Sequence, residues 1–277
     1  MHTATSTTAM EKPSSTPLEL FRSSSPSERT VVRVGPVAIG GPRPAIMAGP
    51  CSVESYEQVL ATAKAVKAAG ATILRGGAYK PRTSPYDFQG LGLEALEILS
   101  AVSAETAMPV VSEVLSTDDI EIVSEHVDML QVGARNMQNF ALLKRLGRLQ
   151  KPILLKRNPA ATVKEWLLAA EYILAGGNGQ VVLCERGIRS YDPQLRNTLD
   201  LAGMALARHM SHLPVIADPS HGTGRSELIP AMSRAALAAG ADGLIIEVHP
   251  HPASALSDGA QSLDFDAFAR LMQDLQW

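Results

Sequence analysis

Residues 45–75 read AIMAGPCSVESYEQVLATAKAVKAAGATILR. The short apolar runs at Ala45–Ala48 and Thr72–Leu74 are typical of buried strands, and the segment Tyr56–Ala69 between them has the apolar spacing of a helix. Gly70 follows that segment, where glycine readily adopts the left-handed conformation that ends helices. A strand, a helix and a second strand in this order predict a βα unit of a parallel sheet.

The same alternation continues to the C-terminus. Six further strands are expected at Val110–Ser112, Met129–Val132, Ile153–Leu155, Val181–Cys184, Val215–Ala217 and Gly243–Glu247. The later helices are expected at Leu93–Glu105, Asp118–Glu125, Gln138–Leu146, Val163–Leu174, Thr198–Arg208, Glu227–Ala239 and Phe265–Leu275. Eight strands that alternate with eight helices predict an α/β fold with a single (β/α)₈ TIM barrel, which commonly needs about 250 residues.

The N-terminal part differs from this repeat. Residues 1–30 are rich in Ser, Thr and Pro and lack apolar periodicity, so we expect a flexible tail with a short helix near Leu18–Arg22. The run VVRVGPVAI at 31–39 contains two strand-like halves about Gly35 and Pro36, which predicts a short β-hairpin. The barrel domain, with this hairpin at its start, is therefore expected to span residues 31–277.

Composition and charge narrow the function classes. The formal net charge is −3, so the chain has no overall positive field that would attract nucleic acid. No apolar run reaches the roughly 18 residues that span a bilayer, and residues 1–30 lack the apolar core of a secretory signal. The two cysteines, Cys51 and Cys184, are far apart in the sequence. We therefore expect a cytoplasmic protein with reduced thiols and with neither nucleic acid nor membrane as a partner.

In a barrel of this type, the active site lies at the C-terminal ends of the strands. Polar side chains occur at the ends of all eight expected strands or in the loops that follow, which favours a catalytic mouth over chance placement. In chain order they are Cys51; Arg75, Lys80 and Arg82; Glu113; Arg135; Lys156 and Arg157; Glu185 and Arg186; Asp218 and His221; and Glu247 and His249. These residues are the candidates for the site.

Cations form the larger subset of these candidates. They are Arg75, Lys80, Arg82, Arg135, Lys156 and Arg186. Arginine supplies paired donors and lysine a compact charge, so together they can surround phosphate or carboxylate groups. Their total charge is too large for one monoanion and suits two anionic substrates or one bisphosphate. Each cation taken singly has the alternative of a surface charge or a structural ion pair, and Arg157 and Arg189 are expected to be surface or supporting groups.

A second subset has the chemistry of metal ligands. Cys51, His221 and Glu247 end strands that become neighbours when the barrel closes, and Asp258 lies in the last loop. One thiolate, one imidazole and two carboxylates suit Mn²⁺, Fe²⁺, Co²⁺ or Zn²⁺. The alternatives are a buried apolar thiol for Cys51, a turn residue for Asp258, and a phosphate-binding helix start for the loop that carries His221. His249 has the alternatives of loop packing and support of the metal ligands.

With these residues assembled, the chain from about Val31 to its C-terminus resembles 3-deoxy-D-arabino-heptulosonate 7-phosphate (DAHP) synthase of the short type I-beta class, the first enzyme of the shikimate pathway. The motifs that carry the resemblance are AGPCSVES (48–55), RGGAYKPRTSPYDFQGLG (75–92), VGARNMQNF (132–140), LLKR (154–157), ERGIR (185–189), DPSHGTGR (218–225) and EVHPHPASALSDGAQSL (247–263). Several independent motifs in the same order make the resemblance specific.

The resemblance implies a transferase that condenses phosphoenolpyruvate with erythrose 4-phosphate and releases inorganic phosphate. It places Arg75 and Lys156 at the phosphoenolpyruvate carboxylate, Arg135 and Arg186 at its phosphate, and Arg82, Thr83 and Ser84 at the aldose phosphate, with Asp218 also among the substrate-binding residues. It makes Cys51, His221, Glu247 and Asp258 the ligands of a divalent metal, with no organic cofactor. Lys80, Cys51, His221 and Glu113 are the implied catalytic residues, and a homotetramer or homodimer is expected.

Other readings remain open at this point. The sister enzyme 3-deoxy-D-manno-octulosonate 8-phosphate synthase shares the barrel, but it carries an asparagine-containing motif where this chain has KPRTSP (80–85), so the four-carbon aldose is favoured. A metal-dependent hydrolase would leave the six cations unexplained, and a noncatalytic sugar-phosphate-binding barrel would not need a complete metal set. Residues 1–30 are too short and polar for the regulatory domain of some relatives, so we expect little feedback inhibition by aromatic amino acids. Asn158 and Pro159 stand where many relatives have glycine.

Overall fold

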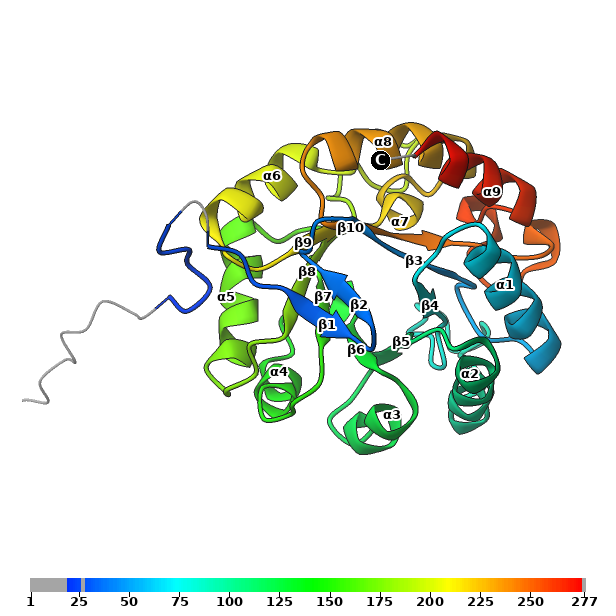
Figure 1. Cartoon of the computed structure of the whole chain (residues 1–277), viewed down its shortest axis with the longest axis horizontal. Coiled ribbons are helices and arrows are strands. Elements are labelled where there is room, and N and C mark those ends of the chain that lie inside the picture. The colour runs from blue at the N-terminus through cyan, green and yellow to red at the C-terminus, as the bar shows by residue number, and fades with distance from the viewer. Residues whose placement is uncertain (1–18, 26–27, 276–277) are drawn as a thin grey trace, which may run out of the picture.

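The computed structural model describes residues 19–25 and 28–275. Within them, eight parallel strands close into a barrel that helices surround (Figure 1). In barrel order the strands are β3 (Ala45–Gly49), β4 (Ile73–Arg75), β5 (Val110–Val114), β6 (Met129–Val132), β7 (Ile153–Lys156), β8 (Val181–Glu185), β9 (Val215–Ala217) and β10 (Gly243–Glu247). Strand β10 pairs with β3 and closes the ring. Each strand overlaps an expected one, so the predicted (β/α)₈ barrel is confirmed.

The helices follow the strands around the outside of the barrel. They are α1 (Tyr56–Ala68), α2 (Leu93–Thr106), α3 (Ile120–His126), α4 (Phe140–Leu146), α5 (Val163–Leu174), α6 (Leu201–Met210), α7 (Pro219–Thr223), α8 (Ile229–Ala238) and α9 (Phe265–Asp274), with short 3₁₀ turns η1 (Ala134–Asn136), η2 (Ser226–Leu228), η3 (Pro252–Ser254) and η4 (Gly259–Gln261). In the described part of the chain, none of these helices combines the length and apolarity needed to cross a membrane.

Local capping explains where several helices begin. Helix α5 starts at a capping box, in which Thr162 accepts a hydrogen bond from the backbone of Glu165 and Glu165 accepts one from the backbone of Thr162. Helix α6 starts three residues later than predicted because Thr198 pairs with Ile188 across the preceding loop. Asp200 then caps α6 by accepting a hydrogen bond from Gly203 N.

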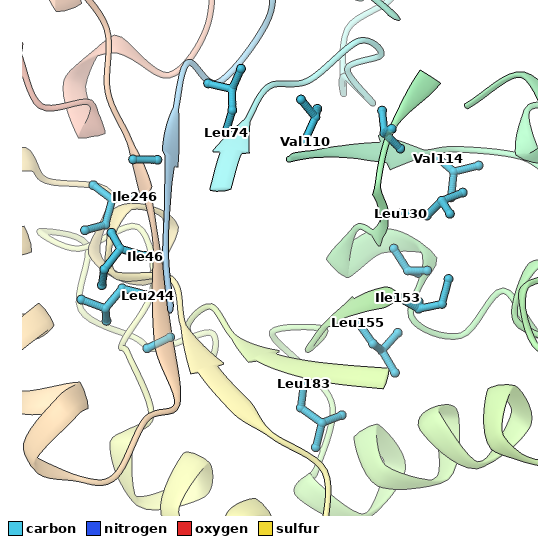
Figure 2. Packing of buried hydrophobic residues seen from close by; sticks show 14 of the residues in the cluster. Ile46, Leu74, Val110, Val114, Leu130, Ile153, Leu155, Leu183, Leu244 and Ile246 are labelled. Atoms are coloured by element: carbon cyan, nitrogen blue, oxygen red, sulfur yellow. The ribbon is translucent and has the colours of Figure 1, made fainter. Parts of the chain in front are cut away.

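The barrel wall buries apolar side chains on both faces. Ile46, Leu130 and Leu183 belong to the cluster that the wall shares with the surrounding helices (Figure 2). Met47 and Met129 alternate with these side chains and belong to a second cluster inside the barrel. The interior is therefore a filled core, and the chemistry is confined to the barrel ends.

The predicted hairpin is confirmed and closes one end of the barrel (Figure 1). Strands β1 (Val32–Val34) and β2 (Val37–Ile39) pair antiparallel about Gly35, whose φ of +55° favours glycine. Val32, Val34 and Ile39 are buried in the interior cluster of the barrel. A Cβ on Gly35 would lie 3.5 Å from Pro109, which directly precedes β5. The hairpin thus covers the N-terminal ends of the strands and leaves the C-terminal ends for the site.

The expectation of a free tail up to residue 30 is wrong for its last part, and its first eighteen residues lie outside the described structure. Phe21 is only 1% exposed, and the backbone N–H groups of Leu20 and Phe21 donate to the Glu171 carboxylate at 2.8 and 3.1 Å. His212 N donates to Phe21 O at 3.1 Å. From Glu19 onward the predicted short helix is replaced by a turn that packs against α5 and the end of α6.

Replacing Phe21 by alanine should therefore destabilise the barrel by about 3 kcal/mol, because it removes a buried aromatic side chain and leaves a cavity. Urea unfolding of the purified protein measures this difference. Leu20→Ala is the matched control, since Leu20 is 39% exposed and its backbone hydrogen bond is kept. Equal unfolding midpoints for the two variants would contradict a docked segment.

Candidate active site

A cavity of about 640 Å³ opens at the C-terminal ends of the strands. Predicted site residues that line it are Cys51, Arg75, Lys80, Arg82, Thr83, Glu113, Arg135, Lys156, Arg186, His221 and Asp258. The predicted site residues Ser84, Asp218 and Glu247 do not line it, and neither do the strand-end candidates Arg157, Glu185 and His249. Because the C-terminal ends of all eight strands meet at one end of the barrel, residues that are separated by up to about two hundred positions in the sequence lie in one cavity.

Strand pairing explains why the candidate metal ligands converge. Glu247 at the end of β10 lies opposite Gly49 of β3, and Cys51 follows Gly49 by two residues. His221 lies in the short helix α7, which starts directly after β9, the other neighbour of β10. Asp258 returns to the same place at the start of η4.

Three of the four predicted ligands form a compact group. One ligand atom from each of Cys51, Glu247 and Asp258 lies within 4.8 Å of the other two, and Cys51 Sγ is 3.1 Å from Asp258 Oδ2. His221 lies beside this group, with Nε2 3.5 Å from Glu247 Oε1 and 3.9 Å from Asp258 Oδ2. Sulfur, nitrogen and oxygen donors therefore lie close together at this end of the barrel.

The protonation of His221 suits a metal ligand. Burial lowers the pKa of His221, so its ring is neutral at neutral pH. Its Nδ1 lies 2.8 Å from Asp218 Oδ2, and we assign the ring proton to Nδ1 on that contact. The lone pair of Nε2 then faces the two carboxylates, as in carboxylate–histidine–metal arrangements.

The charges of the group also favour a bound cation. Burial raises the pKa of Cys51 to about 12, and the neighbouring Glu247 adds to that shift. Burial opposes ionisation of Glu247 and Asp258, but the neighbouring cation of Lys80 helps to hold the pKa of both carboxyl groups below the usual values. Two ionised carboxylates beside a neutral imidazole and a thiol make an electron-rich site that fits a divalent transition metal.

Two cations, Arg75 and Lys80, line the cavity and also contact the candidate metal ligands. Lys80 Nζ donates to Cys51 Sγ at 2.8 Å and lies 3.5 Å from Asp258 Oδ2. Arg75 donates from Nη1 to Pro50 O at 2.8 Å and to Glu247 Oε1 at 3.0 Å. A substrate held by these cations would lie beside the metal position.

Three further cations line the same cavity. Lys156 pairs with Asp218 at 2.7 Å, and Arg135 donates to Pro81 O at 2.7 Å. Arg186 is 8% exposed and, within the described residues, its guanidinium has neither a hydrogen bond nor an ion pair. Burial lowers the pKa of Arg186, and a nearby Arg196 adds to that shift. A buried cation without an anionic partner indicates that an anionic ligand supplies one.

Two arginines in the loop after β8 were not assigned to the site from the sequence. Arg189, which we expected to be a surface or supporting group, lines the cavity, because its backbone N–H is fixed to Pro159 O at 3.0 Å. Arg196 also lines the cavity. Both follow β8 in the same loop as Arg186, but only folding of that loop brings them back to the mouth.

Two residues expected to bind substrate have other contacts. The hydroxyl of Ser84 accepts a hydrogen bond from Tyr86 N at 3.2 Å, which stabilises the turn of its own loop. Asp218 is 1% exposed and is surrounded by Lys156 and His221, so it orients these side chains from beneath the cavity. Arg82, in contrast, lines the cavity with Thr83 and reaches Asp87 at 3.3 Å.

Glu113 presents a carboxylate to the cavity from β5. Gln131 Nε2 donates to Glu113 Oε2 at 2.8 Å and so fixes one of its oxygens. Gly133 lies against the other one, since a Cβ at that position would be 2.0 Å from Glu113 Oε1. The glycine of the VGAR motif thus leaves the space that the carboxylate occupies.

This chain is similar in sequence and in fold to known proteins. The sequence profile described as "DAHP synthetase I family" matches residues 23–277. The phospho-2-dehydro-3-deoxyheptonate aldolase of Thermotoga maritima is 51% identical over 249 residues, which cover 90% of this chain and 74% of that protein. The 2-dehydro-3-deoxyphosphooctonate aldolase of Acidithiobacillus ferrooxidans is 33% identical over 249 residues, which cover 83% of this chain and 88% of that one.

Two solved structures of DAHP synthases have the same fold as this chain. The crystal structure of the Thermotoga maritima DAHP synthase superposes with a TM-score of 0.87 at 51% identity and covers 90% of this chain and 73% of its own. A truncated form of 3-deoxy-D-arabino-heptulosonate 7-phosphate synthase from the same organism gives a TM-score of 0.84 at 48% identity and covers 90% and 91%. This chain therefore belongs to the DAHP synthetase I family of enzymes.

Proposed function

We propose that this enzyme condenses phosphoenolpyruvate with erythrose 4-phosphate to give DAHP and inorganic phosphate, the first step of the shikimate pathway. The observation that carries this proposal is that one cavity is lined by several cations and by Cys51 and Asp258, whose ligand atoms lie within 4.8 Å of Glu247. Two phosphorylated substrates would balance those cations. The greater identity to the heptonate aldolase than to the octonate aldolase also supports it.

The cations divide into three groups by depth and by partners. Arg75 and Lys156 are the most buried, so we assign them to the phosphoenolpyruvate carboxylate. Arg186, which has no partner of its own among the described residues, would receive the phosphate of phosphoenolpyruvate together with Arg135. Arg82 lies farther along its loop, and we assign it with Thr83 to the aldose phosphate. The contacts of Ser84 and Asp218 support only indirect roles for these two residues.

Cys51, His221, Glu247 and Asp258 would hold the metal. Mn²⁺, Fe²⁺, Co²⁺ and Zn²⁺ all suit this mixture of sulfur, nitrogen and oxygen donors. When bound, such a metal supplies Lewis-acid polarisation of the aldehyde oxygen of erythrose 4-phosphate. Asp218 would orient the His221 ring, and Lys80 would compensate the negative charge of Asp258 and the charge that Cys51 gains as a thiolate ligand.

The side chains of the enzyme would then guide a balanced reaction. A bond forms between C3 of phosphoenolpyruvate and the aldehyde carbon, whose oxygen takes up a proton, and C2 gains positive character. Water adds to C2, and phosphate leaves as the bond between C2 and its bridging oxygen breaks and C2 becomes a carbonyl. Of the two protons of the water, one balances the proton taken up by the aldehyde oxygen and the other leaves with the phosphate. We assign the orientation of the water and the transfer of protons to Glu113, which Gln131 holds, and Lys80, which lies beside Cys51. Arg135 and Arg186 would stabilise the charge on the departing phosphate.

The choice of aldose tests this function. We expect kcat/KM for erythrose 4-phosphate to exceed that for arabinose 5-phosphate by about 100-fold, because the aldose phosphate must reach Arg82 without an extra carbon in the chain. A coupled assay of phosphate release with each aldose measures the ratio, and release must require both substrates. Arabinose 5-phosphate as the better substrate would assign the chain to the sister reaction. Phosphate release from phosphoenolpyruvate alone would indicate a hydrolase.

We further propose that the enzyme acts in the cytoplasm as a homotetramer or homodimer. Both cysteines are free thiols, which is usual in a reducing compartment. Analytical ultracentrifugation at micromolar protein concentration tests the oligomeric state, and a monomer would contradict it.

A further inference from the structure

Gln261 and Arg196 form a hydrogen-bonded link between Glu247 and Asp258, the two carboxylates of the candidate metal group. Gln261 is 2% exposed, and its Nε2 donates to Glu247 Oε2 at 2.6 Å. Its Oε1 accepts a hydrogen bond from Arg196 Nη1 at 2.6 Å, and the same Nη1 donates to Asp258 Oδ1 at 3.2 Å. We call these two side chains the Gln261–Arg196 bridge.

The bridge engages one oxygen of each carboxylate and leaves the other one on the side of the remaining candidate ligands. The second oxygen of Glu247 lies 3.5 Å from His221 Nε2, and the second oxygen of Asp258 lies 3.1 Å from Cys51 Sγ. We propose that Gln261 and Arg196 are positioning residues that hold Glu247 and Asp258 with one oxygen each directed at the metal. This inference rests on the metal site of the proposed function and adds the groups that set its geometry.

The backbone at Asp258 shows why such support is needed. Asp258 has a φ of +49°, in the left-handed region that residues other than glycine rarely adopt. This conformation turns the carboxylate back toward Cys51 and persists only where the surroundings enforce it. Gln261 N and Ser262 Oγ each donate to Asp258 O at 3.2 Å, and Arg196 holds the side chain.

Arg196 also joins two loops that the proposed reaction uses. Its backbone N–H donates to Thr223 O at 2.9 Å at the end of α7, the helix that carries His221. Its side chain crosses from the loop after β8, which contains Arg186, to the loop after β10, which contains Asp258. Through Arg196, the loop after β8 therefore contacts the proposed metal ligand Asp258.

Metal affinity, measured without turnover, tests the bridge. The metal-stripped protein is titrated with Co²⁺, and binding is followed by the visible absorption of the Co²⁺–thiolate chromophore and by calorimetry. Gln261→Glu should weaken Co²⁺ binding by about 10- to 100-fold, because it keeps the shape but replaces the donor to Glu247 by an acceptor. Arg196→Ala should weaken binding by about 10-fold, and Arg196→Lys should recover part of that loss.

The matched control is Arg225→Ala. Arg225 contacts Glu227 and Gln194 O, and within the described residues it does not contact Glu247 or Asp258. Its replacement should therefore keep the Co²⁺ affinity within about twofold of wild type. Because both bridge residues act on one unit, the double variant Gln261→Glu/Arg196→Ala should lose less than the product of the single losses. Thermal unfolding of the metal-free variants separates positioning from packing, and a bridge that only packs would leave the affinity of Gln261→Glu unchanged.

The outcomes separate the bridge from the proposed function. Unchanged Co²⁺ affinity in both Gln261→Glu and Arg196→Ala overturns the bridge, even if the wild-type enzyme makes DAHP. Weakened binding in the variants supports the bridge, even if the wild-type enzyme uses another aldose. Failure of the wild-type protein to bind Co²⁺ overturns both the metal site and the bridge.

Discussion

Cys51→Ala is expected to lower kcat/KM by about 1000-fold, which corresponds to about 4 kcal/mol of lost transition-state stabilisation. The thiol lies 3.1 Å from Asp258 and 2.8 Å from Lys80, so its loss removes a proposed metal ligand and leaves Lys80 without its sulfur partner. Steady-state kinetics with excess Mn²⁺, together with the metal content of the purified variant, separate weaker metal binding from slower chemistry.

Cys184 supplies the control for this experiment. It is a fully buried thiol inside the barrel, and burial raises its pKa, but it does not belong to the candidate metal group. Cys184→Ala should keep activity within a few-fold of wild type at a small cost in stability. Chelation of the wild-type enzyme should abolish activity and added Mn²⁺ should restore it. Full turnover of metal-free enzyme, or of Cys51→Ala, would contradict a thiol-ligated metal.

The sequence predicts the barrel and most of the cavity for the same reason. Parallel strands that are covered by helices are apolar along their whole length, so each is a short uninterrupted run, as Ile153–Leu155 illustrates. The first polar residue after such a run must lie at the C-terminal edge of the barrel. Lys156 was found in this way and lines the cavity, and Arg186 lines it one residue after Glu185, the first polar residue of its own strand end.

Residues in the middle of loops escape this rule, because their position depends on how the loop folds. Arg196 returns to the cavity only through its hydrogen bond to Thr223, and Gln261 reaches Glu247 only through the turn that begins at Asp258. Phe21 was missed for a different reason. A single aromatic residue in a Ser- and Pro-rich segment gives no periodic signal, and its partners on α5 and α6 are distant in sequence.

Replacing two cations of the same cavity should change the stability of the protein in opposite directions. Arg186→Met and Lys156→Met each remove one proposed contact with phosphoenolpyruvate, so both should lower kcat/KM by about 100- to 1000-fold. Their effects on stability should have opposite signs, because Lys156 has a buried partner in Asp218 whereas Arg186 has none among the described residues. Kinetics alone would not distinguish the two variants, but unfolding in phosphate-free buffer would.

Lys156→Met leaves the Asp218 carboxylate buried without its cationic partner, and removal of one partner of a buried pair typically costs about 3–5 kcal/mol. Arg186 shows the reverse situation. Its pKa is lowered because folding buries the guanidinium and places it near Arg196, so the folded enzyme tolerates that charge at a cost in stability. Removing it should raise the free energy of unfolding by about 1 kcal/mol, as expected where a binding site is less stable than it could be. Added phosphate should stabilise the wild-type enzyme and not Arg186→Met. Equal destabilisation of both variants would show that Arg186 is a structural residue and would remove it from the phosphate site.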